Sequence, residues 1–171
     1  MTRLFLDCEW ADEIGRELVS LALVSQDGEI FYAERNPLPS APSSFVCAVV
    51  YPLLDRGPAA LPDAVFADNL RNFLSSFCEP LVLADDALDF KMLTHALSGF
   101  GRMRLSPTPP YRQMLVTFGD VLTRIEDYFE TRPEARMKRH HARVDAEALR
   151  WAFEQAMRRG SRGFSGGMTF I

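Results

Sequence analysis

The stretch RLFLDCEW at residues 3–10 begins with apolar side chains and then places two carboxylates where a core strand would continue. Residues 3–7 have the composition of a buried strand, and residues 17–25 (ELVSLALVS) alternate and are rich in valine and leucine. Gln26-Asp27-Gly28 is a hairpin signal, after which residues 29–34 (EIFYAE) continue as a third strand. We therefore expect the chain to start with a three-stranded antiparallel meander.

The rest of the chain alternates helices and strands. Residues 36–65 contain six prolines and predict a long irregular connection, with one short helix or strand at 45–51. An amphipathic helix is expected from Asp63, because its apolar residues recur at helical spacing: Phe66, Leu70, Phe73, Leu74 and Phe77. The later elements are a strand at 80–84, a helix at 87–97, a loop at 98–111, a strand at 113–118, a helix at 120–129 and a last helix from Val144. This order predicts an α/β fold, in which the meander and the following parallel strands form a mixed sheet flanked by helices.

Length and composition set the general class of the protein. The chain has 171 residues, 47% hydrophobic and 25% charged, which favours one soluble globular domain and excludes disorder and fibrous repeats. No apolar run approaches the roughly 20 residues that span a bilayer. The N-terminus does not resemble a signal peptide, so we expect a cytoplasmic protein. We expect residues 1–157 to form a single domain and residues 158–171, which carry no acid, to form a flexible tail.

The charge distribution indicates a class of partner, and the cysteines disfavour two kinds of structural site. The net charge of −4 divides into −9 for residues 1–131 and +5 for residues 132–171, which is compatible with a polyanionic partner along one rim. The three cysteines have no paired spacing, which disfavours both a disulfide framework and a cysteine-rich zinc site.

Asp7 and Glu9 are the most informative residues. Side chains of a strand alternate between its faces, so the two carboxylates point the same way, about 7 Å apart. Burying either costs several kcal/mol unless something pairs with it. The other interpretation is that the strand ends at Leu6 and leaves both acids in a solvated loop.

Two more polar clusters follow buried segments. In LVLADDALDFKML at residues 81–93, Asp85 or Asp86 is a candidate N-cap, and Asp89 lies in the first helical turn, where the helix dipole alone could account for it.

The second cluster lies in RHHARVDAEALRWAF at residues 139–153, where His140, His141 and Asp145 gather at the start of the last helix. Asp145 could be only a first-turn acid and the histidines a surface pair. Neither cysteines nor an HxxxH spacing supports zinc.

Together the clusters favour a metal-dependent chemistry. Carboxylates from strand ends and helix starts form an all-oxygen site suited to Mg²⁺ or Mn²⁺. A neighbouring histidine can exchange protons near neutral pH. Two divalent ions about 4 Å apart are a common arrangement for in-line displacement at phosphate.

The motifs also carry a family resemblance. Asp7-Cys8-Glu9 is a D-x-E motif in the opening strand, Asp89 lies in ADDALDFKML after another strand, and His140 with Asp145 forms H-x4-D at the head of a helix. This ordered set resembles the DEDD superfamily of 3′–5′ exonucleases, in the branch that uses histidine. Small bacterial exoribonucleases of the ribonuclease T and oligoribonuclease type are the most similar members.

The sequence departs from the family pattern at four positions. Asp85 stands where the family often has Asn, Leu88 replaces an aromatic residue, Val144 replaces an acid, and Trp10 replaces Thr or another smaller residue. None of these changes removes an expected metal ligand.

The resemblance implies a ribonuclease H-like fold and hydrolysis of phosphodiester bonds from a 3′ end, with RNA favoured over DNA and nucleoside 5′-monophosphates as products. Two Mg²⁺ or Mn²⁺ ions would bind, the first to Asp7, Glu9 and Asp145 and the second to Asp7 with Asp89. His140 would be the general base, with His141 as the competing histidine. Family members are commonly homodimers. Two alternatives remain: a catalytically silent nucleic-acid-binding module, and a hydrolase restricted to di- and very short oligonucleotides.

Several further residues are candidates for contact with nucleic acid. Trp10 could stack on a base or belong to the core, and Arg143 could bind a phosphate. The basic residues before His140 could line the substrate path or lie in a solvated loop; they are Arg132, Arg136, Lys138 and Arg139.

Overall fold

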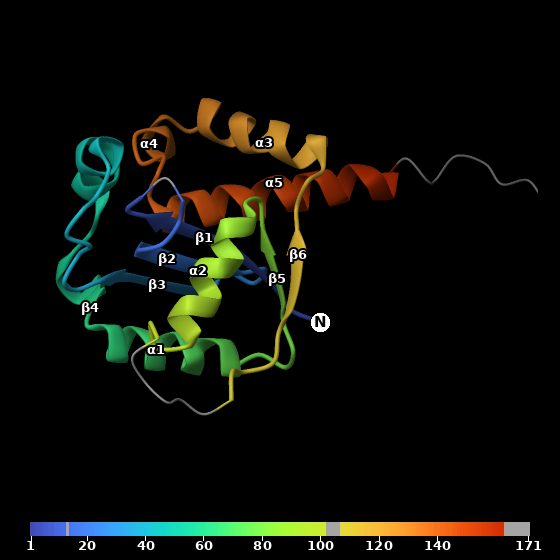
Figure 1. The fold of residues 1–171 in the computed structure, drawn as a ribbon. Coiled ribbons are helices and arrows are strands. Elements are labelled where there is room, and N and C mark those ends of the chain that lie inside the picture. Colours follow the sequence, from blue (N-terminus) through green and yellow to red (C-terminus); the bar gives the residue numbers. More distant parts are fainter. Residues whose placement is uncertain (13, 102–106, 163–171) are drawn as a thin grey trace, which may run out of the picture.

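The computed structural model describes residues 1–12, 14–101 and 107–162, and side chains through Arg158. Its strands are β1 (Arg3–Trp10), β2 (Leu18–Ser25), β3 (Ile30–Arg35), β4 (Ala60–Leu61), β5 (Leu81–Ala84) and β6 (Arg112–Leu115). Its α-helices are α1 (Asp63–Ser75), α2 (Ala87–Leu97), α3 (Gly119–Glu130), α4 (Pro133–Arg136) and α5 (Ala142–Arg162). The strands form one mixed sheet in the order β4-β3-β2-β1-β5-β6, and helices cover both of its faces (Figure 1).

Strand β2 is antiparallel to both of its neighbours, β1 and β3, whereas the other neighbouring pairs are parallel. The expected α/β class, with an antiparallel meander followed by parallel strands, is confirmed. The topology is compatible with a ribonuclease H-like fold.

Strand β1 continues through both of its carboxylates. Asp7 lies opposite Ala22 and Glu9 opposite Ser20 in β2, and the register shifts only between Glu9 and Trp10. The interpretation that the strand ends at Leu6 is therefore wrong. The physical reason is that β2 is buried along its whole length and offers backbone partners to β1 beyond Leu6.

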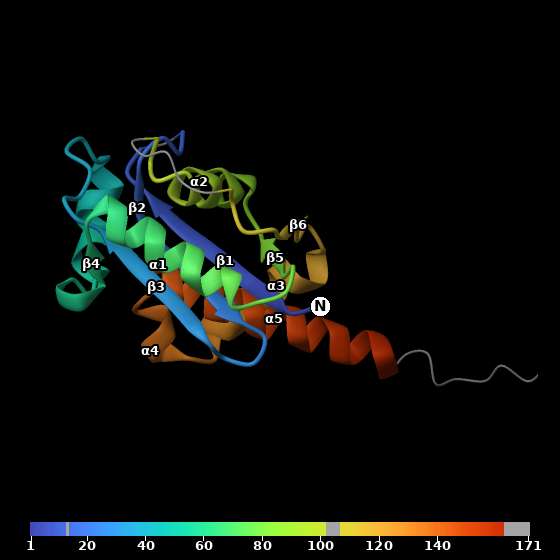
Figure 2. The same ribbon diagram turned by 90° about the horizontal axis from the view of Figure 1, so that it is seen from below.

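The two faces of β1 belong to different cores. Leu4, Leu6 and Cys8 pack in the larger core with α1 and α2, whereas Phe5 packs in a second core with α3 and α5. Figure 2 shows α1 crossing one face of the sheet and α5 on the opposite side. Since side chains alternate along a strand, the side chains of Asp7 and Glu9 lie on the Phe5 face, below the start of α5.

Helix α5 approaches the sheet closely at its N-terminal end. Ala142 and Ala146 pack there against Ala22 and Val24 of β2. Small side chains on both surfaces let the helix lie near the backbone of the sheet. This packing brings the first turn of α5, and the residues just before it, over the carboxyl-terminal half of β1.

Some element boundaries differ from the expected ones. The segment at 45–51 is a π-helical turn (Val46–Val50) followed by a 3₁₀ turn (Tyr51–Leu53), and β4 was not expected. Strand β6 ends at Leu115 rather than residue 118, because its partner β5 ends at Ala84, opposite Leu115. Helix α4 was also not expected.

Helix α5 is longer than expected at both ends. It starts two residues before Val144 and continues through Arg162, so residues 158–162, expected in the tail, are helical. An ion pair between Arg158 and Glu154, one turn earlier, accompanies this extension. The rest of the expected tail, residues 163–171, lies outside the described residues. Within the described part of the chain, no helix has the length and apolarity needed to cross a bilayer.

Candidate active site

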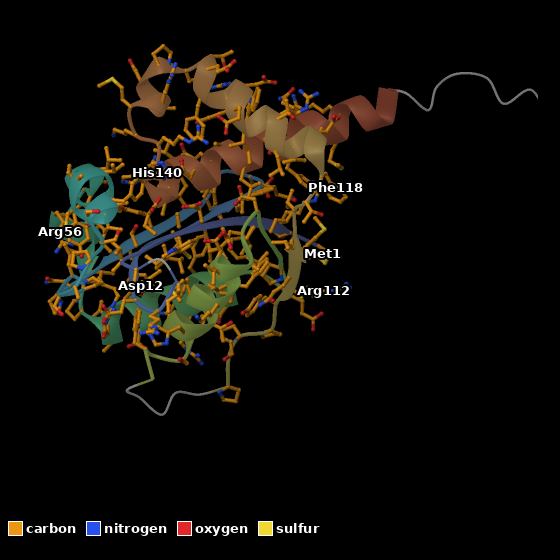
Figure 3. All side chains as sticks on the ribbon, turned by 45° about the horizontal axis from the view of Figure 1, so that its top comes forward. Met1, Asp12, Arg56, Arg112, Phe118 and His140 are labelled. Carbon is orange, nitrogen blue, oxygen red and sulfur yellow. The ribbon has the colours of Figure 1, made fainter. Side chains whose placement is uncertain are left out.

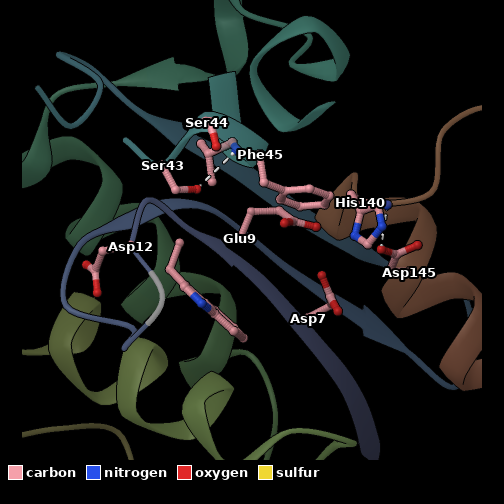
Figure 4. Close-up of a pocket in the computed structure, with 10 residues that line it drawn as sticks. Asp7, Glu9, Asp12, Ser43, Ser44, Phe45, His140 and Asp145 are labelled. Atoms are coloured by element: carbon pink, nitrogen blue, oxygen red, sulfur yellow. Dashed lines mark hydrogen bonds between the residues drawn. The ribbon is translucent and has the colours of Figure 1, made fainter. Parts of the chain in front are cut away.

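A cavity of about 400 Å³ opens at the carboxyl-terminal end of β1. Asp7, Glu9 and Trp10 line it from the strand, and His140 and Asp145 line it from the start of α5 (Figure 4). The opposite wall is the turn Ser43, Ser44, Phe45 and Val46, with Asp12 beside it. Three segments far apart in the sequence therefore meet at one polar cavity.

The first potential metal-binding group consists of Glu9, His140 and Asp145. Each offers one ligand atom, and these atoms lie within 4.8 Å of one another. The backbone N–H of His140 donates a hydrogen bond to Oδ2 of Asp145, at 2.9 Å. His140 lies in the connection that leads into α5 (Figure 3) and has a φ of 74°. This left-handed conformation costs on the order of 1 kcal/mol, and the bond to Asp145 holds it.

The second group consists of Asp7, Asp85 and Asp89, whose ligand atoms also lie within 4.8 Å of one another. Asp89 is only 1% exposed, and its Oδ1 accepts a hydrogen bond from the backbone N–H of Cys8, at 3.0 Å. The N-cap of α2 is Asp86, which accepts from the N–H of Leu88. Asp89 therefore faces β1 and has a role beyond the helix dipole.

Two carboxylate oxygens of the site have no hydrogen-bond donor among the described residues. They are Oδ2 of Asp7 and Oδ1 of Asp145, and both are buried. Leaving a buried acceptor without a partner costs about 1–3 kcal/mol, and more if the group is charged. Carboxylate oxygens are the preferred ligands of Mg²⁺ and Mn²⁺, so this donor set fits such ions.

The pKa values of the site's acids also indicate that the surrounding described residues supply little positive charge to them. Burial raises the pKa of Asp7 well above its usual range, and the carboxylates of Asp145, Asp89 and Glu9 raise it further. Burial and Asp145 raise the pKa of Glu9 to about 8.

Burial likewise raises the pKa of Asp145 to about 7, although the N–H of His140 and the charge of Arg139 oppose the change. Burial and the charges of Asp85 and Asp86 raise the pKa of Asp89, against the effect of the Cys8 N–H. A bound cation would favour the ionised form of every one of these acids.

The structure separates the two neighbouring histidines. The ring of His140 lines the cavity, and the ring of Phe45 lies edge-on to it, with 5.1 Å between the ring centroids. Burial and the charge of Arg139 lower the pKa of His140, which favours the neutral imidazole. The side chain of His141 is 3% exposed, and its ring stacks on that of Tyr32 with 4.6 Å between the ring centroids. Its Nε2 lies 3.6 Å from a carboxylate oxygen of Asp55. His140, with the spacing of the H-x4-D motif, is the histidine in the carboxylate cluster.

The other expected contact residues lie in different surroundings. Trp10 lines the cavity and also packs against the larger core. Arg143 is exposed, pairs with Glu147 at 3.1 Å and does not belong to the cavity lining.

The basic residues before His140 are also used in different ways. Arg139 makes two hydrogen bonds to Glu126, at 2.8 and 2.6 Å. The guanidinium of Arg132 stacks on Tyr128 and Trp151. Arg136 and Lys138 are exposed.

Sequence reasoning did not find the wall of the cavity formed by the turn at residues 43–46. The N–H of Ser43 donates to the carbonyl of Ala11 at 2.8 Å, and Ser43 Oγ accepts from the N–H of Val46. These bonds fix the turn to the end of β1 and place Phe45 at the cavity. Asp12 accepts from three backbone N–H groups of its own loop, those of Ile14, Arg16 and Glu17. No periodic pattern in this proline-rich segment could have indicated Phe45.

A scan against protein-family models finds no match for the chain, and a search of curated proteins finds none either. The resemblance to the DEDD exonucleases therefore stays a prediction from the motifs. What the structure adds is the convergence of Asp7, Glu9, Asp89, His140 and Asp145 on one site.

Proposed function

We propose that the protein is a two-metal-ion 3′–5′ exonuclease that hydrolyses phosphodiester bonds from the 3′ end of nucleic acid and releases nucleoside 5′-monophosphates. The observation that carries this proposal is a pair of neighbouring carboxylate groups, Glu9 with Asp145 beside the ring of His140, and Asp7 with Asp85 and Asp89. Carboxylates in two adjacent groups are what a two-ion centre for phosphoryl transfer requires. Two buried oxygens of these groups, Oδ2 of Asp7 and Oδ1 of Asp145, have no donor in the described chain, and a bound cation would give both a partner.

Mg²⁺ or Mn²⁺ is the proposed cofactor, with two ions per active site. Asp7, Glu9 and Asp145 would hold the first ion, and Asp7 with Asp89 would hold the second. Bound there, the two ions would supply Lewis-acid stabilisation of the attacking and leaving oxygens of the phosphodiester.

His140 is proposed as the general base that accepts a proton from the attacking water. Its lowered pKa keeps the imidazole neutral near pH 7, the form that can accept a proton. The backbone bond to Asp145 and the edge-on contact with Phe45 restrict the backbone and the ring of His140. His141 is stacked on Tyr32 and would take no direct part.

The cavity also suits a nucleotide. Its volume of about 400 Å³ lies in the range of small-ligand pockets, roughly 300–1,000 Å³. Phe45 is 50% exposed, and both Phe45 and Trp10 line the cavity, so aromatic surfaces are available for a base. The preference for RNA over DNA, a homodimeric assembly and a cytoplasmic location are parts of the proposal that rest on the family resemblance.

The test is a nuclease assay with matched RNA and DNA oligonucleotides carrying a 5′ label, in Mg²⁺, in Mn²⁺ and in EDTA. We expect a ladder that shortens from the 3′ end, 5′-monophosphate products and no reaction in EDTA. Asp7→Asn is the control and should lower the rate at least about 100-fold, because it removes a ligand of both ions.

The same assay separates the alternatives. Binding of oligonucleotides without cleavage in any metal would contradict the exonuclease and leave a silent binding module. Cleavage of dinucleotides but not of longer chains would instead identify a hydrolase of very short oligonucleotides.

A further inference from the structure

Asp85 lies beside Asp7 because of the register between two parallel strands. In that register Phe5 of β1 pairs with Leu83 of β5, and two further residues lead to Asp7 and Asp85 respectively. The carboxylate oxygens of both residues and of Asp89 lie within 4.8 Å of one another. Asp85 is the exposed member of this group and Asp89 the buried one.

The three carboxylates lack a positive partner among the described residues. In the described part of the chain, no lysine or arginine forms an ion pair with Asp7, Asp85 or Asp89. The Cys8 N–H satisfies one oxygen of Asp89, but the buried Oδ2 of Asp7 has no donor among the residues that the structure describes. The neighbouring Asp86 is already used as the N-cap of α2 and belongs to neither ligand group.

The number of carboxylates matters for when a cation binds. Mg²⁺ in phosphoryl-transfer sites is usually bound by one or two carboxylates plus phosphate oxygens of the substrate, so such an ion binds weakly until the substrate arrives. A third carboxylate from the protein takes the place of some of the substrate's phosphate oxygens, so the ion binds more tightly before the substrate arrives.

We infer that Asp85 is a further metal ligand, and that with Asp7 and Asp89 it holds the second divalent cation before any nucleic acid binds. This inference rests on the proposed function, since it concerns the same metal centre, but it can fail separately.

The test counts bound Mn²⁺ in the protein without nucleic acid, by electron paramagnetic resonance of free Mn²⁺ and by calorimetric titration. Wild type should bind two Mn²⁺ per chain. Asp85→Asn should weaken one of the two sites at least about tenfold, as expected for the loss of a ligand. Asp86→Asn is the matched control: it removes the same charge one residue away, keeps an N-capping side chain, and should change either Kd less than about threefold.

Each result decides a separate point. One bound Mn²⁺ in wild type, or equal Kd values for Asp85→Asn and Asp86→Asn, would overturn the inference and leave the proposed exonuclease standing. No bound Mn²⁺ in wild type would overturn the metal centre of the proposed function as well. Asp85→Ser serves as a second variant, and the thermal unfolding of both metal-free Asp85 variants, expected at or above the wild-type Tm, verifies that they fold.

Discussion

Adding Mg²⁺ or Mn²⁺ to the metal-free protein should release protons from the carboxylate cluster. A carboxylate must be ionised to bind a cation, so any proton held by a ligand is released when the metal binds. Ordinary aspartates and glutamates, with pKa values near 4, hold almost no protons at neutral pH and would release none. Proton release therefore reports whether the buried acids of this site bind the metal.

The expected number follows from Glu9, whose pKa burial and Asp145 raise to about 8, and from Asp145, whose pKa burial raises to about 7. At neutral pH these groups hold about 0.9 and about 0.5 proton, so metal binding should release at least about 1.4 protons per chain. At a pH two units higher they hold about 0.1 proton together, so the number released should fall by about 1.3. Metal affinity should rise over the same interval, because fewer protons compete with the cation.

The assay is calorimetric titration with MnCl₂ in several buffers of different ionisation enthalpy, since the slope of heat against that enthalpy is the number of protons released. Glu9→Gln is the informative variant and should remove about 0.9 of the protons at neutral pH. Metal binding that releases fewer than about 0.3 protons at neutral pH would refute the reasoning, because the ligands would then be ordinary ionised acids.

Three other results are expected. His140→Ala should lower turnover about 10²–10⁴-fold, which is the usual contribution of a general base, and two Mn²⁺ should still bind. Single-turnover cleavage at the wild-type rate would show that another group accepts the proton. His141→Ala should lower the free energy of unfolding in urea by about 2–4 kcal/mol, because it removes a buried ring stacked on Tyr32, and His141→Phe should recover much of the loss; a silent alanine variant would contradict that packing role. In EDTA, the Tm should fall as the pH rises from about 7.5 to about 9, because Glu9 and Asp145 hold protons in the folded state that the unfolded chain has already lost. The histidines, whose pKa values are lowered, bind few protons in either state over this range, so a Tm that is flat or rises would contradict the raised pKa values of the two acids.

The parts of the fold that local patterns control could be predicted from the sequence. The apolar composition of residues 3–7 indicated β1 and the alternation in residues 17–25 indicated β2. The spacing of Phe66, Leu70 and Leu74 indicated α1, in which all three are buried. The H-x4-D spacing indicated the histidine that lies in the cluster. In each case the information is contained within about ten consecutive residues.

The parts of the site that could not be predicted depend on contacts between distant segments. Asp85 joins Asp7 only through the parallel register of β1 and β5, which no local pattern encodes. Phe45 reaches the cavity because Ser43 bonds to the backbone of Ala11, in a proline-rich connection without periodicity. The ring of His140 lines the cavity, whereas the ring of His141 stacks on Tyr32, a contact between distant segments that no local pattern in the sequence indicates.

Another buried acid in the same protein supports the interpretation of the site. Glu34 of β3 is fully buried and lies in the same row as Glu9, since both are paired with Ser20 of β2. Its carboxylate accepts hydrogen bonds from the hydroxyl of Tyr32, at 2.7 Å, and from the backbone N–H of Asp55, at 2.6 Å. Its other oxygen accepts from the backbone and the guanidinium of Arg56, at 3.0 and 3.2 Å.

This fold therefore surrounds a buried carboxylate with donors and a positive charge where the carboxylate has a structural role. On the same face of the sheet, Asp7 keeps a buried oxygen without any donor in the described chain, and so does Asp145, which lies over that face. A buried carboxylate without donors is costly, and the neighbouring protein groups at Glu34 show that the fold can supply them. The difference between Glu34 and the pair Asp7 and Asp145 is explained if the partner of that pair is a cation from solution, as the proposed function requires.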